Sequence, residues 1–511
     1  MISLFYPGES LAYEQVKTLP EPAYFRDLNI GQYVDAFAER FEAKELKPYF
    51  YCFSGSYETA KYRQEIVRDL TTPAIRDAIE RFENGILEAV NCAKCSQKVI
   101  ENIQKYKWNV DCVHTYYLAM EELCVAFNTT PPKSKAFYEL HQELYHILNT
   151  SAVRRLRQSA KLLNEEFAKM RFQLCINKEK ATFEYTYDPN DYCMPIRNAL
   201  AHSADNTDYV PFRELPFPSI DIAPLEAFII ARLVKENRQL FLQMETFGKN
   251  CENVISQDVL DILKELRFYR YNIEFFDDLK QKGMPTVMPL LVKDKELYMD
   301  DCYDVALALR NLAAKREVVL NDIMKANYEK AIIVTGPNQG GKTTLGRAFG
   351  QCFYFGMMGL YVPAGVCKLP YISGIYTHFA NEEGAEGVDG RLVNELQRIR
   401  EMLQVIDNRG LVILNELFTS APTVDALAMS RDLLKRLIAN NAICFCVTHT
   451  YEIALDSDDY VSLVATVVED GSFRRTYRII RKAADGIAYA DSIVSKYKLD
   501  YSHINYRLHR K

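Results

Sequence analysis

The sequence lacks any hydrophobic run long enough to cross a membrane. A membrane-spanning helix needs about 18 consecutive apolar residues, and every window of about that length here is interrupted by charged residues. The first residues, MISLFYPGESLAYEQ, also lack the basic segment followed by an apolar core that marks an export signal. We therefore expect neither membrane insertion nor export.

Cysteines are present without a disulfide pattern. The 13 cysteines are odd in number and scattered along the chain, whereas disulfide-rich proteins are short and densely crosslinked. The segment CAKC at 92–95 has no second pair of ligands with metal-site spacing, so it does not predict a zinc site. Reduced thiols and a cytoplasmic location are the expectation.

The chain also lacks a large excess of charge, internal repeats and low-complexity segments. A net charge of -6 over 511 residues excludes a strongly basic nucleic-acid coat but permits a local basic surface. The length exceeds what one core supports, and 48% of the residues are hydrophobic. These values predict an ordered chain of two to four domains.

Hydrophobic spacing divides the chain into a helical part and a mixed part. Between about 55 and 280, apolar residues recur every three or four positions, which predicts long helices. Around 173–222 this spacing is interrupted, and alternating Phe183, Tyr185 and Tyr187 predict strands. From 331, apolar runs alternate with helical segments, the rhythm of an α/β domain, and Asp470-Gly471 predicts a hairpin turn. The predicted parts are an N-terminal segment (1–60), a mainly helical domain (61–285) with a small β-containing insertion (about 173–222), an α/β domain (286–490) and a tail (491–511).

A phosphate-binding loop is predicted at AIIVTGPNQGGKTTLGRAF. Glycines, a lysine and a threonine follow an apolar strand and precede a helical segment, the context that such a loop requires. The glycines let backbone N–H groups converge on phosphate oxygens. Lys342 is expected to reach the β- and γ-phosphates, and Thr343 to offer its hydroxyl to Mg²⁺. The predicted nucleotide contacts are Gly336, Pro337, Asn338, Gln339, Gly340, Gly341, Lys342, Thr343 and Thr344.

The run LVILNE at 411–416 occupies the place of the second strand of such a site. The strand is expected to end in an acid for the metal and a second acid for water, but Asn415 stands at the first position and Glu416 at the second. Loss of a charge beside Mg²⁺ weakens metal retention by about 1–2 kcal/mol. Two interpretations stay open: a slow ATPase in which Glu416 positions water, or a nucleotide-binding switch with negligible turnover.

These residues resemble the MutS family of DNA mismatch-repair ATPases. The resemblance lies in TGPNQGGKTT, FGMMGLYVPA, VVLNDI, NELFTSAPTVDA, FCVTHTYEI and, near the start, YRQEIVRDL. It extends from about 60 to 500 and implies a multidomain protein with a helical lever region and an ABC-type ATPase domain. It also implies that Asp425 is the acid of the loop after the second strand and that His449 senses the γ-phosphate.

Several departures from the family pattern change the expected function. Only 61 residues precede Tyr62, too few for the mismatch-recognition and connector domains, and Phe5 lacks the Glu two residues later that would form a Phe-x-Glu wedge. Mismatch reading by that wedge is not expected. A C-terminal nuclease extension of the kind seen in one branch of the family is likewise not expected.

The resemblance implies a homodimer, because family members complete each nucleotide site with a signature segment from the partner subunit. Here the segment EEGAEGVDGRLVNEL has Gly390, Arg391 and Leu392 where Ser-Thr-Phe is typical. Arg391 could act as a finger on the partner's γ-phosphate. An ordinary solvated helix residue is the alternative.

A basic stretch precedes the insertion at about 173–222. The resemblance identifies this insertion as a reduced form of the clamp with which the family grips DNA. Residues 151–180 contain eight Lys or Arg against three Glu, and Arg154, Arg157 and Lys161 share one helical face. A solvated helix face is the simpler alternative. The resemblance thus implies a dimeric ATPase that uses ATP and Mg²⁺ to gate a clamp on duplex, mismatched or branched DNA. The competing hypothesis is a nucleotide-gated module that acts on RNA, the ribosome or a protein partner with little ATP turnover.

Overall fold

The computed structural model describes most of the chain, namely residues 2–9, 11–99, 101–177, 180–186, 224–251, 254–379, 390–468 and 475–484. The chain forms two compact units. The first comprises Pro73–Pro132 and Tyr138–Leu260, and the second comprises Ile2–Thr72, Lys133–Phe137 and Asp261–Lys511. The four-part division with boundaries at 60, 285 and 490 stays a prediction.

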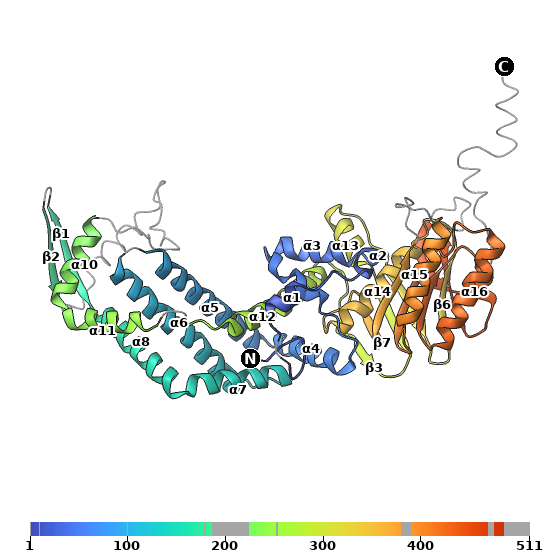
Figure 1. The fold of residues 1–511 in the computed structure, drawn as a ribbon. Coiled ribbons are helices and arrows are strands. Elements are labelled where there is room, and N and C mark those ends of the chain that lie inside the picture. Colours follow the sequence, from blue (N-terminus) through green and yellow to red (C-terminus); the bar gives the residue numbers. More distant parts are fainter. Residues whose placement is uncertain are drawn as a thin grey trace, which may run out of the picture. The chain divides into compact units, whose positions relative to one another are not determined.

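Long helices build the first unit, as the apolar spacing predicts (Figure 1). Gly85 permits a close crossing of two of them, because a Cβ atom there would lie 2.7 Å from the Ala119 side chain. A small core of Tyr106, Val110, Leu163 and Met244 joins one of these two helices to two others. The helices are α5 (Pro73–Lys98), α6 (Asn102–Thr129), α7 (Lys135–Asn149), α8 (Ser151–Lys169), α10 (Pro224–Glu236) and α11 (Arg238–Lys249).

A two-stranded antiparallel sheet follows α8. It pairs β1 (Arg171–Asn177) with β2 (Lys180–Thr186), and Arg171 lies opposite Thr186. The strand expected at Phe183 and Tyr185 is therefore confirmed. Tyr187 and most of the predicted clamp insertion lie outside the described residues.

Two sheets form the framework of the second unit. The larger has the order β12-β11-β6-β10-β9-β8, with β12 antiparallel to β11 and the other neighbours parallel. The smaller has the order β3-β7-β4-β5. The strands are β3 (Leu290–Val292), β4 (Leu297–Cys302), β5 (Asn321–Lys325), β6 (Ala331–Thr335), β7 (Val366–Pro370), β8 (Gly374–Phe379), β9 (Gly410–Asn415), β10 (Ile443–Val447), β11 (Tyr460–Val467) and β12 (Arg475–Arg481).

The predicted α/β rhythm and the final antiparallel strand pair are confirmed. Apolar runs form β6, β9 and β10, which are buried throughout because helices cover both faces of the large sheet. The turn expected at Asp470-Gly471 lies outside the described residues. The helices after residue 250 are α12 (Gln257–Gln281), α13 (Val305–Ala313), α14 (Lys342–Met357), α15 (Arg391–Val405), α16 (Thr423–Ala439) and a 3₁₀ helix, η2 (Tyr451–Leu455).

Strand alternation assigns each face of the large sheet to different helices. Val412 and Leu414 lie in one core with residues of α15 and α16. Ile413, Phe445 and Val447 lie on the opposite face, where they approach Gly346 of α14. Successive strand residues point to opposite faces. Helices α14 and α15 therefore contact different sides of the same strands.

The N-terminal residues pack onto α14 and belong to the second unit. Arg63 is fully buried and donates to the carbonyl oxygens of Phe5 and Cys52 at 2.9 Å each. The Tyr354 hydroxyl of α14 donates to Phe50 O at 2.5 Å. The elements of this segment are α1 (Tyr13–Lys17), α2 (Tyr24–Asp27), α3 (Ile30–Arg40), the 3₁₀ helix η1 (Lys44–Tyr51) and α4 (Tyr57–Leu70). Across the described part of both units, none of the helices has the length and apolar character of a membrane span.

Candidate functional site

The predicted phosphate-binding loop connects β6 to α14. Gly336 and Gly341 have φ of 116° and 92°, and Gln339 has a φ of 59°. A Cβ atom on Gly336 would lie 2.9 Å from the backbone N of Ala465 in β11. Glycine is therefore required at Gly336 both by the backbone conformation and by the strand behind the loop.

Lys342 is hydrogen-bonded to the loop that precedes it. Its Nζ donates to Gly336 O and Pro337 O at 3.0 Å each. The residue is 4% exposed, and burial lowers the pKa of its ammonium group, while the nearby Glu416 carboxylate opposes that change. A phosphate group is a better partner for this buried cation than two neutral carbonyl oxygens.

Thr343 and Asn415, the two predicted metal residues, are in contact. The Thr343 hydroxyl donates to Asn415 Oδ1 at 2.9 Å. Asn415 ends β9 and is 8% exposed. Because the amide oxygen is the acceptor, the pair presents neutral oxygens where a carboxylate is usual. Hard cations such as Mg²⁺ bind through oxygen atoms, so the donor type fits the ion but the charge is reduced.

Glu416 and His449, the two predicted catalytic residues, also form a pair. His449 Nε2 lies 2.7 Å from Glu416 Oε1. The hydrogen bond from His449 holds the pKa of the Glu416 carboxyl below its usual range, and the positive charge of Lys342 contributes in the same direction. Glu416 has a φ of 57°, and its N–H donates to Val447 O at 2.9 Å. The side chain is thus held as a carboxylate at the end of β9.

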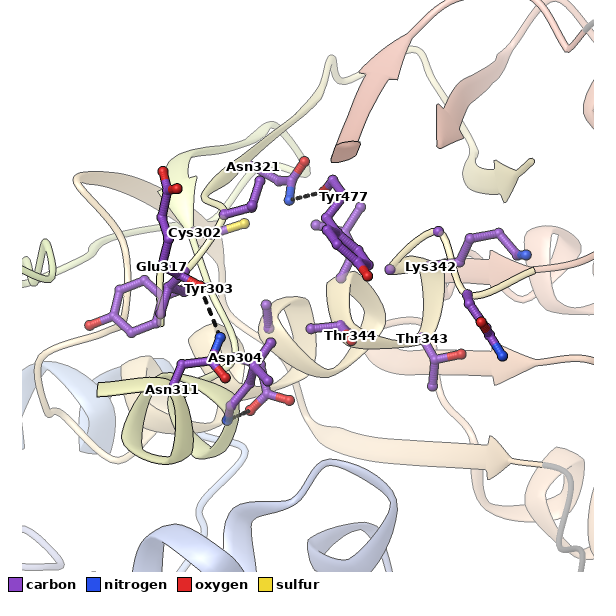
Figure 2. A pocket seen from close by; sticks show the side chains of 18 of the residues that line it. Cys302, Tyr303, Asp304, Asn311, Glu317, Asn321, Lys342, Thr343, Thr344 and Tyr477 are labelled. Atoms are coloured by element: carbon purple, nitrogen blue, oxygen red, sulfur yellow. Dashed lines mark hydrogen bonds between the residues drawn. The ribbon is translucent and has the colours of Figure 1, made fainter. Parts of the chain in front are cut away.

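A pocket of about 540 Å³ opens beside the loop (Figure 2). It lies between the start of α14, the start of α13, the segment 316–319 and Tyr477 of β12. The Tyr477 ring lies near Gly341, since a Cβ atom added there would be 3.8 Å from Tyr477 Cδ1. Asn321 holds β12 in place by donating to Tyr477 O at 3.1 Å and accepting from Ile479 N at 2.7 Å.

Tyr477, Asn321 and Arg475 support the pocket and the loop, but they are not among the residues predicted from the sequence. Arg475 Nε donates to Asn338 O at 3.0 Å, so β12 also supports the loop. Each of these contacts joins segments more than 130 residues apart. The only signal in the sequence was the basic and aromatic segment RRTYR in a predicted strand. That segment does not indicate which part of the protein the strand faces.

The other predicted contacts are placed away from this pocket. Asp425 is exposed in the first turn of α16 and does not line the pocket. Gly390 is the N-cap of α15, and Arg391 is the first residue of that helix; the Arg391 side chain lies outside the described part of the structure. The residues that the structure brings together are therefore those of the loop with Asn415, Glu416 and His449.

The basic residues predicted to contact nucleic acid lie on α8 in the first unit. Arg157 forms an ion pair with Glu121 of α6 and retains 21% side-chain exposure. Arg154 donates to Asn149 Oδ1 at 2.7 Å, and Lys161 lies 4.0 Å from Glu165. Part of the positive charge on this face is thus already balanced by neighbouring acids.

Comparison with known proteins gives the same family for the second unit. Residues 332–495 match the family model described as MutS domain V. DNA mismatch repair protein MSH3 of Arabidopsis thaliana is 27% identical over 214 residues, 40% of this chain and 19% of that protein. Endonuclease MutS2 of Ligilactobacillus salivarius is 25% identical over 195 residues, 38% of this chain and 24% of that protein. Endonuclease MutS2 of Agathobacter rectalis is 22% identical over 370 residues, 68% of this chain and 44% of that protein. The chain spans less than half the length of each of these relatives.

Proposed function

We propose that this chain, which belongs to the MutS family, is a slow ATPase whose nucleotide state controls binding to DNA. MutS domain V, matched at 332–495, is the ATPase domain of that family. The observation that carries the proposal is the convergence of two polar pairs at the end of β9. The contacts of Thr343 with Asn415 and of Glu416 with His449 support their assignment to metal binding and water activation in phosphoryl transfer.

The pocket and loop support binding of a nucleoside triphosphate. The backbone N–H of Gly341 and the positive end of α14 suit the phosphates, and Lys342 would exchange its two carbonyl acceptors for phosphate oxygens. The pocket of about 540 Å³ beyond the loop has the size of a small-molecule site. Tyr477 offers a flat aromatic face at its edge, suited to a nucleobase. We assign ATP as the nucleotide because of the family.

In the proposed mechanism, Glu416 orients the attacking water and accepts its proton. The lowered pKa keeps the carboxylate ionised at neutral pH, which a base requires. His449 holds that carboxylate, and we assign it the role of sensing the γ-phosphate because of the family. Thr343, supported by Asn415, would hold Mg²⁺, which supplies charge stabilisation when bound. The neutral Asn415 weakens this metal site, and slow turnover is the expected consequence.

A homodimer is part of the proposal, supported by the position of α15, since none of its described side chains lines the pocket of its own chain. Val393 and Leu396 on α15 and Val424 on α16 are exposed apolar residues, and such residues favour burial against a second subunit. We propose that Gly390 and Arg391 face the nucleotide of the partner. Asp425 would lie at the same interface.

DNA is the proposed ligand of the helical unit. The first relatives above are named for DNA mismatch repair and endonuclease activity, and α8 carries a basic face with Arg154 and Lys161 exposed. Nucleotide-driven closure of the dimer would change the position of these helices. A nucleotide-gated module that acts on RNA, the ribosome or a protein partner is the competing function, since Arg157 is already paired with Glu121.

One experiment tests nucleotide and DNA together. Binding of homoduplex, mismatched and four-way DNA is measured by gel shift with and without Mg²⁺ and ATP, over a salt titration, beside direct measurement of ATP affinity. Lys342→Ala should weaken ATP binding about tenfold or more, because a charge-assisted contact contributes about 1.5–3 kcal/mol, and should abolish the effect of ATP on DNA binding. Lys435→Ala, which removes an exposed lysine of α16, is the control. Unchanged ATP affinity of Lys342→Ala refutes the nucleotide site, and absence of DNA binding at moderate salt favours the competing function.

A further inference from the structure

A second buried polar pair lies behind the catalytic end of β9. His378 of β8 and Glu395 of α15 meet with Nε2 and Oε1 3.0 Å apart. Their side chains are 6% and 13% exposed. His378 pairs in register with Leu414, so it lies on the face of the sheet covered by α15 and α16. The pair is thus separate from Lys342 and Thr343, which belong to the opposite face.

The same carboxylate oxygen holds the backbone just after the proposed base. Phe418 N donates to Glu395 Oε1 at 2.7 Å. Both hydrogen bonds hold the pKa of the Glu395 carboxyl below its usual range against the effect of burial. A carboxylate that accepts a backbone N–H in a buried position fixes that backbone strongly.

The backbone from Glu416 to Phe418 needs such support. Glu416 and Phe418 have φ of 57° and 54°, a left-handed conformation that residues other than glycine rarely adopt. Three contacts retain this turn: Val447 O accepts from Glu416 N, Glu395 accepts from Phe418 N, and the Phe418 side chain is buried in the core with α15 and α16. The direction of the Glu416 carboxylate toward His449 depends on this turn.

His378 is itself fixed from the other side of its strand. Thr377 Oγ1 donates to Asp27 Oδ2 of α2 at 2.7 Å, and Arg347 Nε of α14 donates to Asp27 O at 3.0 Å. Residues 377 and 378 point to opposite faces. β8 is therefore anchored to α14 on one face and to α15 on the other.

We propose that Glu395 and His378 are positioning residues for ATP hydrolysis, which hold Glu416 through the N–H of Phe418. They act on turnover and not on nucleotide binding, because they lie on the sheet face covered by α15 and α16, whereas Lys342 and Thr343 belong to the opposite face. Glu395 lies just over one turn from Gly390, the first residue of the proposed trans contact. A partner subunit that contacts the start of α15 can therefore affect the position of Glu416 through the Glu395 carboxylate. This inference rests on the proposed ATPase function.

The test separates turnover from binding in the full chain. Single-turnover ATP hydrolysis, ATP affinity and thermal midpoint are measured for wild type, Glu395→Ala, Glu395→Gln and His378→Ala. Glu401→Ala, which removes an exposed glutamate of the same helix, is the control. Glu395→Ala should slow hydrolysis about tenfold or more, because a positioned base contributes about a hundredfold or more and this variant loses part of that positioning. Its ATP affinity should stay within about twofold of wild type. Glu395→Gln should recover part of the rate, since its amide oxygen still accepts from Phe418 N.

A second arm distinguishes positioning from a general structural role. In a Glu416→Gln background, Glu395→Ala should cause no further loss of rate, because both changes act on the same carboxylate. Equal losses of rate in both backgrounds, or a parallel loss of ATP affinity, overturn the inference, as does wild-type turnover of Glu395→Ala. If the wild-type chain binds ATP but never hydrolyses it, the proposed function and this inference fail together. Turnover in wild type that is insensitive to Glu395 refutes only the inference.

Discussion

At the level of single residues, β9 ends in the amide side chain of Asn415. Asn415 Oδ1 already accepts from the Thr343 hydroxyl at 2.9 Å, so an aspartate of nearly the same shape fits without rearrangement. Asn415→Asp should bind Mg²⁺ more tightly by about 1–2 kcal/mol, because it restores a charge beside the ion. The expected result is a half-saturating Mg²⁺ concentration lowered by a factor of about 5–30, measured as ATP turnover against Mg²⁺.

The control for that charge is Asn440→Asp, at the exposed C-cap of α16. It adds the same charge away from the loop and should leave the Mg²⁺ dependence unchanged. If Asn415→Asp behaves like Asn440→Asp, Asn415 does not act at a metal site. If it tightens Mg²⁺ without raising turnover, the chain is a nucleotide switch rather than a slow enzyme.

Residues within a recognisable sequence motif were predictable, whereas residues brought to the site from distant parts of the chain were not. Lys342, Thr343, Asn415 and Glu416 follow from strand, loop and helix order, because that order fixes a local geometry. Tyr477 belongs to a strand whose partner, facing loop and support by Asn321 arise only on folding. A contact of that kind has no local signature.

At the scale of elements, strands β6, β9 and β10 could be predicted because they are continuous apolar runs. Those runs are buried on both faces, and such burial removes the polar alternation that otherwise obscures short strands. The packing of α4 on α14 could not be predicted in this way. It depends on Gly359, where an added Cβ would lie 2.3 Å from Arg63 Cβ and 2.9 Å from Gln64 N.

Gly359→Ala tests how tightly α4 holds the end of α14. The residue has a φ of 76° and faces backbone atoms that cannot rotate away, so we expect a loss of about 2 kcal/mol or more in stability. The thermal midpoint should fall by several degrees. Gly31→Ala is the matched control, since a Cβ at that helical position meets no atom within 4 Å and alanine favours helix. A midpoint of Gly359→Ala equal to that of Gly31→Ala contradicts the close packing.

At the scale of the whole molecule, the N-terminal residues are tied to the second unit through a buried carboxyl. Glu265 of α12 is 1% exposed. Leu4 N donates to its Oε2 at 2.5 Å, and Ser3 Oγ donates to its Oε1 at 3.3 Å. Burial raises the pKa of Glu265 from its ordinary value of 4.5 to about 8. No pattern in the sequence indicates this contact, which joins residues more than 260 positions apart.

The raised pKa predicts a pH dependence of stability with a definite sign. Between about pH 4.5 and 8 the folded protein holds a proton at Glu265 that the unfolded chain has lost, so stability falls as pH rises through that range, by at most about 1.4 kcal/mol per pH unit. Glu265→Gln keeps an oxygen for Leu4 N but does not ionise. The thermal midpoint of wild type should therefore drop more than that of Glu265→Gln between pH 5.5 and 8.5, and the variant should be the more stable protein at the higher pH. Parallel midpoints across the range would mean that Glu265 stays ionised where it lies, and that its hydrogen bonds to Ser3 and Leu4 offset the cost of burying the charge.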